Sequence, residues 1–146
     1  MRALLSLILV AISVMAAYST GQYTEDIIDN GVSKGMATLL LESDSATFAL
    51  LRSRLPERFP STALYRKYVG CWEIKNDSLF LDSVLIMNPT SETPEFIPLY
   101  IDDIYDSRRI GSRYFADWVT DTLRIVSGNF VRYDHSGWSA DWEHEE

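Results

Sequence analysis

Residues 68–86 read YVGCWEIKNDSLFLDSVLI. Over residues 68–75, every second position holds an aromatic, aliphatic or glycine residue, and the positions between them differ in polarity. This period of two is typical of a strand with one buried face. Asn76-Asp77 interrupts the pattern with two residue types that are common in hairpin turns, and residues 78–86, which are mostly apolar, return as the second strand. We therefore predict a β-hairpin over residues 65–86 that turns at Asn76-Asp77.

A two-residue turn also fixes the register of this hairpin, because each residue before the turn then opposes one residue after it. The predicted pairs, counted outward from the turn, are Ile74–Leu79, Glu73–Phe80, Trp72–Leu81 and Cys71–Asp82. The first and third pairs place large apolar side chains on one face, and the other two pairs give a mixed face. One face of this hairpin is therefore expected to lie in the core.

Two further hairpins are predicted on either side of this one. Asn30-Gly31 separates residues 26–29 from 32–39, and this dipeptide is a strong local signal for a hairpin turn. Residues 114–119 and 122–126 flank Thr120-Asp121 and form the other hairpin. Its predicted pairs are Trp118–Leu123, Asp117–Arg124 and Ala116–Ile125. The core is then expected to contain Trp72, Ile74, Leu79, Leu81, Trp118, Leu123 and Ile125.

The end of the chain is predicted to form two more strands. Turn-forming residues at 127–129 precede a strand over 130–133, and Asp134 to Gly137 turns the chain again. Residues 138–142 alternate like a strand and are expected to pair with 130–133, with residues 143–146 frayed. A strand in this position ends the sheet, and an unpaired edge is a plausible docking surface for a partner.

One helix is expected, over residues 43–55. Ser43 or Ser45 can cap its start, apolar residues recur at helical spacing, and Pro56 ends it. Residues 88–98 contain three prolines and are interpreted as a loop, and 99–107 are either one short helical turn or irregular. The predicted fold class is α+β: a single domain, residues 23–146, built mostly of antiparallel β-hairpins with one short helix.

The first 22 residues are interpreted as a signal peptide. Met1-Arg2 supplies a positive charge, residues 3–17 are apolar except for two serines, and small residues follow at 16–22, where cleavage is expected. The apolar run is shorter than the ~20 residues of a membrane span. The remaining domain is therefore expected to be exported and soluble, in the periplasm or outside the cell, with no membrane span.

The charge of the chain limits the classes of partner that it is expected to bind, and its cysteine content limits the disulfides that it can form. The chain has a formal charge of −8, which becomes −9 when Arg2 leaves with the signal peptide. An acidic protein of this kind is a poor candidate for binding nucleic acid or anionic membranes. The single cysteine, Cys71, excludes an intramolecular disulfide and is interpreted as a small buried apolar residue.

Two motifs resemble a group of uncharacterised bacterial proteins that share a domain of unknown function. These are Trp-Glu-Ile-Lys-Asn-Asp-Ser-Leu at 72–79 and Phe-Ala-Asp-Trp at 115–118, followed by Thr-Leu-Arg-Ile at 122–125. The chain departs from the family pattern at Lys67 and Asp121, where the family has glycine, and the family continues through at least one more strand. The resemblance implies a fold for most of the domain and no mechanism.

Several motifs of the common enzyme classes are missing from the sequence. It contains no Gly-rich phosphate loop, no His-Glu-x-x-His and no Cys-x-x-Cys. Asp117, between aromatic residues, and His135 are the candidate catalytic acid and base for a small hydrolase. The predicted partner Arg124 makes an ordinary cross-strand ion pair the simpler interpretation of Asp117.

Neither metal nor cofactor is predicted. Asp134, His135 and Asp141 are better interpreted as solvated loop residues than as ligands. The acidic residues at 102, 103 and 106 lack the spacing of a calcium loop. Trp138 and Trp142 share a strand face, and either stack against a sugar or cover the end of the core.

These observations favour a non-catalytic module that binds a protein or a glycan. The alternatives are a small hydrolase that uses Asp117 and His135, and an inhibitor or immunity-type protein that neutralises an exported partner through its acidic surface.

Overall fold

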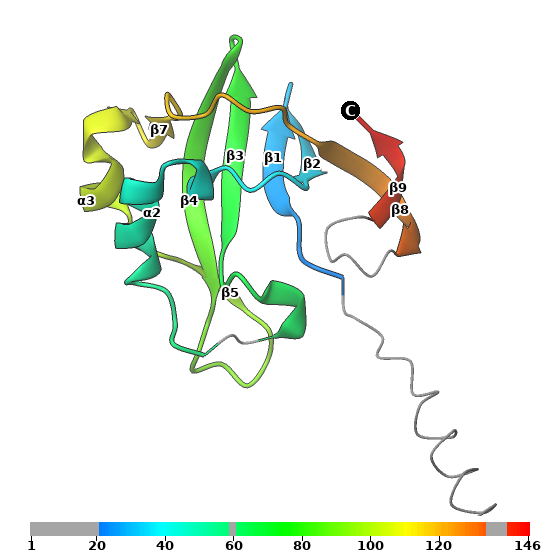
Figure 1. Ribbon diagram of the computed structural model, residues 1–146, viewed down its shortest axis with the longest axis horizontal. Helices are drawn as coiled ribbons and strands as arrows, with labels where there is room; N and C mark the ends of the chain where they lie inside the picture. The colour runs from blue at the N-terminus through cyan, green and yellow to red at the C-terminus, as the bar shows by residue number, and fades with distance from the viewer. Residues whose placement is uncertain (1–20, 59–60, 134–139) are drawn as a thin grey trace, which may run out of the picture.

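The fold is a single mixed sheet with short helices (Figure 1), seen in a computed structural model that describes residues 21–58, 61–133 and 140–146. The strands of this part of the chain are β1 (Glu25–Asp29), β2 (Val32–Met36), β3 (Val69–Lys75), β4 (Ser78–Met87), β5 (Phe96–Pro98), β6 (Arg109–Ile110), β7 (Arg113–Phe115), β8 (Ile125–Tyr133) and β9 (Ala140–Glu145). Their order across the sheet is β6-β7-β4-β3-β1-β2-β8-β9, and β5 pairs with β4. The predicted single, mostly antiparallel α+β domain is confirmed at this level.

The helices are short. They are η1 (Leu41–Ser43), α2 (Ser45–Arg52), η2 (Thr62–Leu64), α3 (Asp102–Tyr105) and η3 (Asp106–Arg108). Helix α2 is the predicted one, but its cap is Asp44, whose carboxylate accepts hydrogen bonds from the Thr47 backbone N–H (3.2 Å) and hydroxyl (2.7 Å). Figure 1 shows α2 and α3 next to each other beside β4. None of the described helices has the length and hydropathy needed to cross a bilayer.

Two of the predicted hairpins are present. Asn30 (φ +49°) and Gly31 (φ +80°) join β1 to β2, and Asn76 (φ +51°) and Asp77 (φ +56°) join β3 to β4. Both pairs adopt the positive φ angles that a tight two-residue hairpin turn requires. Three predicted pairs of the second hairpin are observed: Ile74–Leu79, Glu73–Phe80 and Trp72–Leu81.

The fourth predicted pair is wrong because β4 contains a bulge. Cys71 lies opposite Ser83 rather than Asp82, so Asp82 is the extra residue between two regular parts of the ladder. The remainder of the hairpin continues with Gly70 opposite Val84. The bulge gives β4 an exposed carboxylate at the point where its register shifts.

The third predicted hairpin is also wrong. Strand β7 ends at Phe115 and pairs with β4 and β6, and residues 116–124 form no strand. The indole N–H of Trp118 instead donates to the backbone carbonyl of Leu40 (3.1 Å), and its ring lies 5.4 Å from that of Tyr105. The segment therefore packs its apolar side chains onto the core and does not return as a strand.

Three expectations for other segments need correction. Residues 127–129 make no turn, because β8 continues through them with an irregular register around Gly128 (φ +82°). The C-terminal residues are not frayed: Glu146 and Ile125 exchange backbone hydrogen bonds of 2.9 and 3.0 Å. The loop predicted over 88–98 ends in strand β5, which pairs with β4. Strand β9 does pair with β8, as predicted, but its first described residue is Ala140.

The core lies between the sheet and the helices. Of the predicted core residues, Trp72, Leu81 and Ile125 are buried, and Ile74, Leu79, Trp118 and Leu123 are partly buried and pack against them. Helices η1 and α2 contribute Leu41 and Leu51 to the same cluster. The main apolar cluster therefore lies on one face of the sheet, and a smaller cluster of Leu64, Val69 and Met87 lies apart from it.

A buried charge lies between β1 and β3, which pair in parallel. The side chain of Glu25 is fully buried and accepts hydrogen bonds from the Trp72 indole N–H (2.7 Å) and the Gly70 backbone N–H (3.1 Å). Arg66 Nε lies 3.3 Å from the same carboxylate, and the guanidinium donates to the backbone carbonyls of Tyr23 and Thr24. This network ties the start of β1 to β3 and to the segment before it.

Candidate functional site

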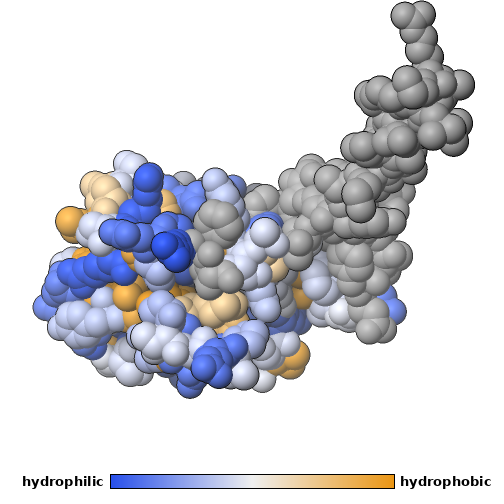
Figure 2. All heavy atoms as spheres, turned by 90° about the horizontal axis from the view of Figure 1, so that it is seen from below, coloured by the Kyte–Doolittle hydropathy of each residue, from blue (hydrophilic) through white to orange (hydrophobic). Residues whose placement is uncertain are grey.

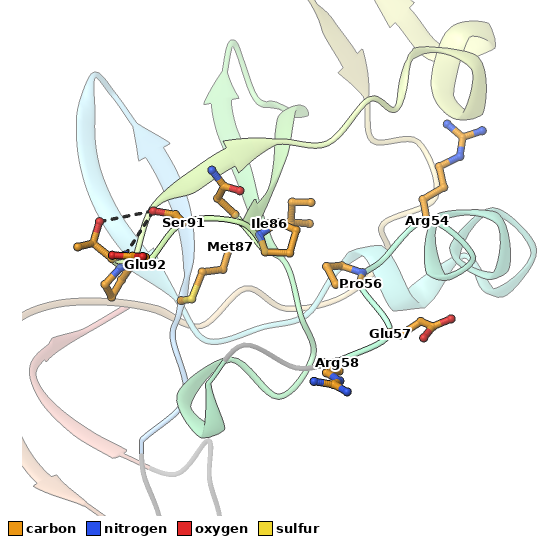
Figure 3. Close-up of a pocket in the computed structure, with 12 residues that line it drawn as sticks. Arg54, Pro56, Glu57, Arg58, Ile86, Met87, Ser91 and Glu92 are labelled. Atoms are coloured by element: carbon orange, nitrogen blue, oxygen red, sulfur yellow. Dashed lines mark hydrogen bonds between the residues drawn. The ribbon is translucent and has the colours of Figure 1, made fainter.

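A groove of about 780 Å³ (Figure 3) lies between residues 54–58 and 86–94. Figure 3 shows Arg54 directed away from Ile86 and Met87, and its guanidinium makes two 2.6 Å hydrogen bonds to the Asp103 carboxylate. The Ser91 hydroxyl contacts Thr93, and among the described residues it bonds to no acidic or basic side chain. The groove is lined by apolar side chains such as Ile86 and Met87 and by polar and charged ones.

Asp117 lies in an exposed turn after β7. Its carboxylate accepts a hydrogen bond from Arg108 Nε (2.8 Å), and Arg108 also bonds to Asp44 (3.0 Å) and covers the Trp118 ring. The predicted pairing with Arg124 is wrong, because Arg124 bonds to Glu145 (2.6 Å). Asp117 thus helps fix the turn to the start of α2.

The other predicted site residues are near the end of the chain. His135, Trp138 and the loop residue Asp134 lie outside the described residues. Trp142 is in β9, opposite Phe130, and is partly exposed. Strand β9 is the last strand in the sheet order, as expected for the C-terminal segment.

The acidic residues before β6 are held by arginines. Asp102 bonds to Arg109 (2.8 Å) and accepts a hydrogen bond from the Tyr114 hydroxyl, Asp106 bonds to Arg109 (3.2 Å), and Asp103 bonds to Arg54. The Tyr114 hydrogen bond is the main cause that holds the pKa of Asp102 below its usual range. These carboxylates are structural ion pairs. No metal-binding group of three or more Asp, Glu, His or Cys side chains occurs in the described ranges.

Cys71 lies on the face of β3 opposite to Trp72, next to Ser83. The thiol is free, and burial raises its pKa to about 11. The thiol is therefore protonated at neutral pH and is a weak nucleophile.

A different feature emerges on that same face of the sheet. The core contains Ile27, Trp72, Leu81 and Tyr114, so the neighbours that alternate with them point to the opposite face. These neighbours and the hairpin β6–β7 form what we call the open-face patch: Ile28, Glu73, Phe80, Ile110, Arg113 and Phe115.

The register of four strands aligns this patch. Ile28 lies opposite Glu73, Glu73 opposite Phe80, and Phe80 opposite Phe115, so one row crosses β1, β3, β4 and β7. The two phenylalanine rings are 5.8 Å apart, and Arg113 lies 5.3 Å from the Phe80 ring and bonds to Glu73. The row is therefore a continuous, ordered surface.

Apart from the Glu73–Arg113 ion pair, the patch is apolar, and three of its apolar members are exposed. Ile110 is 58% exposed, Ile28 43% and Phe115 38%. On the face seen from below in Figure 2, by contrast, apolar residues form small patches among hydrophilic ones. Exposed aromatic and aliphatic side chains on adjacent strands, with a bonded arginine among them, have the composition of a protein-binding surface. Strand alternation in the sequence predicted a mixed outer face for the β3–β4 hairpin. It did not predict that Ile28 and Phe115 align with this face, because they come from β1 and β7, which are distant from the hairpin in the sequence.

Comparison of the chain with models of protein families, with curated proteins and with solved structures gave no match.

Proposed function

We propose that the protein is an exported, non-catalytic module that binds another protein through the open-face patch. The observation that carries this proposal is the aligned row of Ile28, Glu73, Phe80 and Phe115 beside Arg113 and the exposed Ile110. Aromatic residues and arginine are the residue types that contribute most to protein–protein binding energy.

A protein partner fits the patch better than a glycan. Sugar hydroxyls need polar groups that are available beside the aromatic ring. On this patch, Glu73 and Arg113 bond to each other, and the remaining members are apolar. Neutralisation of an exported protein is one form that such binding can take.

Substitution of Phe115 by serine tests this function. Loss of an aromatic side chain from the centre of an interface is expected to weaken binding at least about tenfold. The purified protein, immobilised, is used to capture partners from the extracytoplasmic fraction of the source cells, and the captured partner is then titrated against each variant. The control is Leu50→Ser, which removes a side chain of 57% exposure from α2, on the other side of the sheet.

The proposal requires that wild type and Leu50→Ser bind the same partner with equal affinity and that Phe115→Ser does not. A partner that binds all three proteins alike would show that the patch is not the binding surface. Thermal unfolding of each variant establishes that loss of binding does not reflect loss of folding.

Export gives a separate prediction. Gln22 donates a side-chain hydrogen bond to the Thr62 carbonyl (2.7 Å), and the Tyr23 N–H donates to the Ala63 carbonyl (2.8 Å). Cleavage at 16–22 therefore leaves Tyr23 in place. Mass spectrometry of the extracytoplasmic protein is expected to find a new N-terminus between Ala17 and Tyr23. An intact Met1 in that fraction would contradict removal of a signal peptide.

A further inference from the structure

The outer edge of β4 has a gap in its strand pairing. Strand β7 pairs with β4 at Phe80 and Leu81, and β5 pairs with it from Leu85 to Met87. The residues between these two partners include the bulged Asp82 and Ser83. Because β5 and β7 pair with different parts of the same edge of β4, the stretch of that edge beside the bulge lies between them. Bulges commonly redirect side chains at functional sites.

A cavity of about 400 Å³ lies at this gap. It is lined by the two β4 residues, by the segment after β5 and by the β6–β7 hairpin: Asp82, Ser83, Pro98, Leu99, Tyr100, Ile101, Asp102, Arg109, Ser112 and Tyr114. None of these residues belongs to the open-face patch. The Leu99 N–H donates to the Val84 carbonyl (2.8 Å), which holds the wall that carries Tyr100 against β4.

The charges of the cavity wall are largely compensated. Arg109 bonds to Asp102 (2.8 Å) and Asp106 (3.2 Å), so its guanidinium offers little attraction for an anion. The Asp82 carboxylate makes no hydrogen bond or ion pair with another described residue. The cavity therefore offers a carboxylate that accepts hydrogen bonds, serine hydroxyls that donate and accept, and N–H groups of an arginine that is paired with two carboxylates.

Tyr100 is also part of the cavity lining. The side chain of Tyr100 is 66% exposed, although its backbone carbonyl is fixed by a hydrogen bond from Arg54 (3.1 Å). A fixed backbone with an exposed ring presents a flat apolar surface at low entropic cost. We propose that this cavity binds a neutral sugar, whose C–H face packs on Tyr100 and whose hydroxyls bond to Asp82 and Ser112.

The test uses the purified protein and three neutral oligosaccharides: cellotetraose, maltotetraose and a chitin tetrasaccharide. At least one of them is expected to shift the backbone amide NMR signals of residues 82–83, 100–102 and 112. Tyr100→Ala and Asp82→Ala are each expected to weaken that binding about tenfold, whereas Tyr100→Phe keeps the ring and retains it. The matched control is Tyr65→Ala, which removes an equally exposed tyrosine (69%) elsewhere.

Two results would overturn the sugar site: no shift with any of the three oligosaccharides, or equal binding by wild type and Tyr100→Ala. Spermidine is included because Asp82 is also able to attract a cation. If spermidine shifts these amides and the sugars do not, the ligand class is wrong. The Phe115→Ser variant is expected to retain sugar binding, so failure of the protein-binding proposal and failure of this one are distinguishable.

Discussion

Replacement of Trp72 by alanine is expected to reduce the free energy of unfolding by about 3–5 kcal/mol, the range for truncating a buried aromatic side chain. Trp72 is 1% exposed, its ring lies 6.2 Å from that of Trp118, and its N–H donates to Glu25. The substitution removes this packing and leaves the buried carboxylate with one fewer donor. Urea unfolding followed by circular dichroism gives the value.

Trp142→Ala is the matched control for Trp72→Ala. Trp142 is partly exposed on β9, at the end of the sheet, so the same substitution is expected to cost much less. Equal losses from the two variants would contradict the central position of Trp72 in the core.

Replacement of Glu25 by alanine is expected to destabilise the protein by a similar amount, about 3–5 kcal/mol, because it removes one partner of a buried ion pair. The Arg66 side chain is only 5% exposed and would lose its counter-ion, and the Trp72 and Gly70 N–H groups would lose their acceptor. Glu25→Gln keeps the side-chain volume and an acceptor for one of these two N–H groups, and is expected to lose less than Glu25→Ala. Equal losses from Ala and Gln would show that hydrogen bonding contributes little here.

Glu25 also makes the free energy of unfolding depend on pH, in a direction that follows from the shift of its pKa. Burial raises the pKa of Glu25 above its ordinary value of 4.5, despite the opposing effect of Arg66. The folded state therefore holds this proton more tightly than the unfolded state, and the resulting stabilisation is complete below pH 4.5 and decreases as pH rises toward the raised pKa. Glu25→Gln removes this term, so its stability relative to wild type is expected to improve between pH 4 and pH 8. A difference that stays constant over this range would contradict the raised pKa.

The parts of the fold that the sequence predicts are those set by neighbouring residues. Asn30-Gly31 and Asn76-Asp77 identify both tight turns, because few other residue pairs tolerate two consecutive positive φ angles. Helix α2 was predictable from its apolar spacing, but it spans Ser45–Arg52 and so ends before Pro56, the predicted stop. In each of these elements, the signal and the structure lie within the same short segment.

The parts that the sequence does not predict depend on distant partners. Alternation around Trp118 favours a strand, but its ring and N–H meet Tyr105 and Leu40, so the segment packs as a loop. The bulge at Asp82 shifts the register by a single residue, and nothing local distinguishes it from a regular strand position. Tertiary contacts override local preference in both cases.

For the candidate sites, too, the sequence indicates features within one segment but not those that join distant segments. The sequence singled out Asp117 because it lies between aromatic residues, and the structure shows that Arg108 binds it. The open-face patch and the cavity beside Asp82 join residues from several strands, so neither forms a motif. Strand alternation predicts which face a residue occupies, but not which strands become neighbours.

The parallel pairing of β1 with β3 has a consequence for the order of folding. The β3–β4 hairpin is local and is expected to form on the microsecond scale. By contrast, β1 and β3 are separated in the sequence by the whole of α2. Strand β2 pairs with β8, which lies near the other end of the chain; Gly35, for example, is opposite Val126. Such non-local pairings slow folding because loop closure precedes the gain from contacts. As the chain emerges N-terminus first, the β1–β2 hairpin exposes both of its edges until β3 and β8 arrive. We expect this interval to be the stage at which the chain is most prone to aggregate.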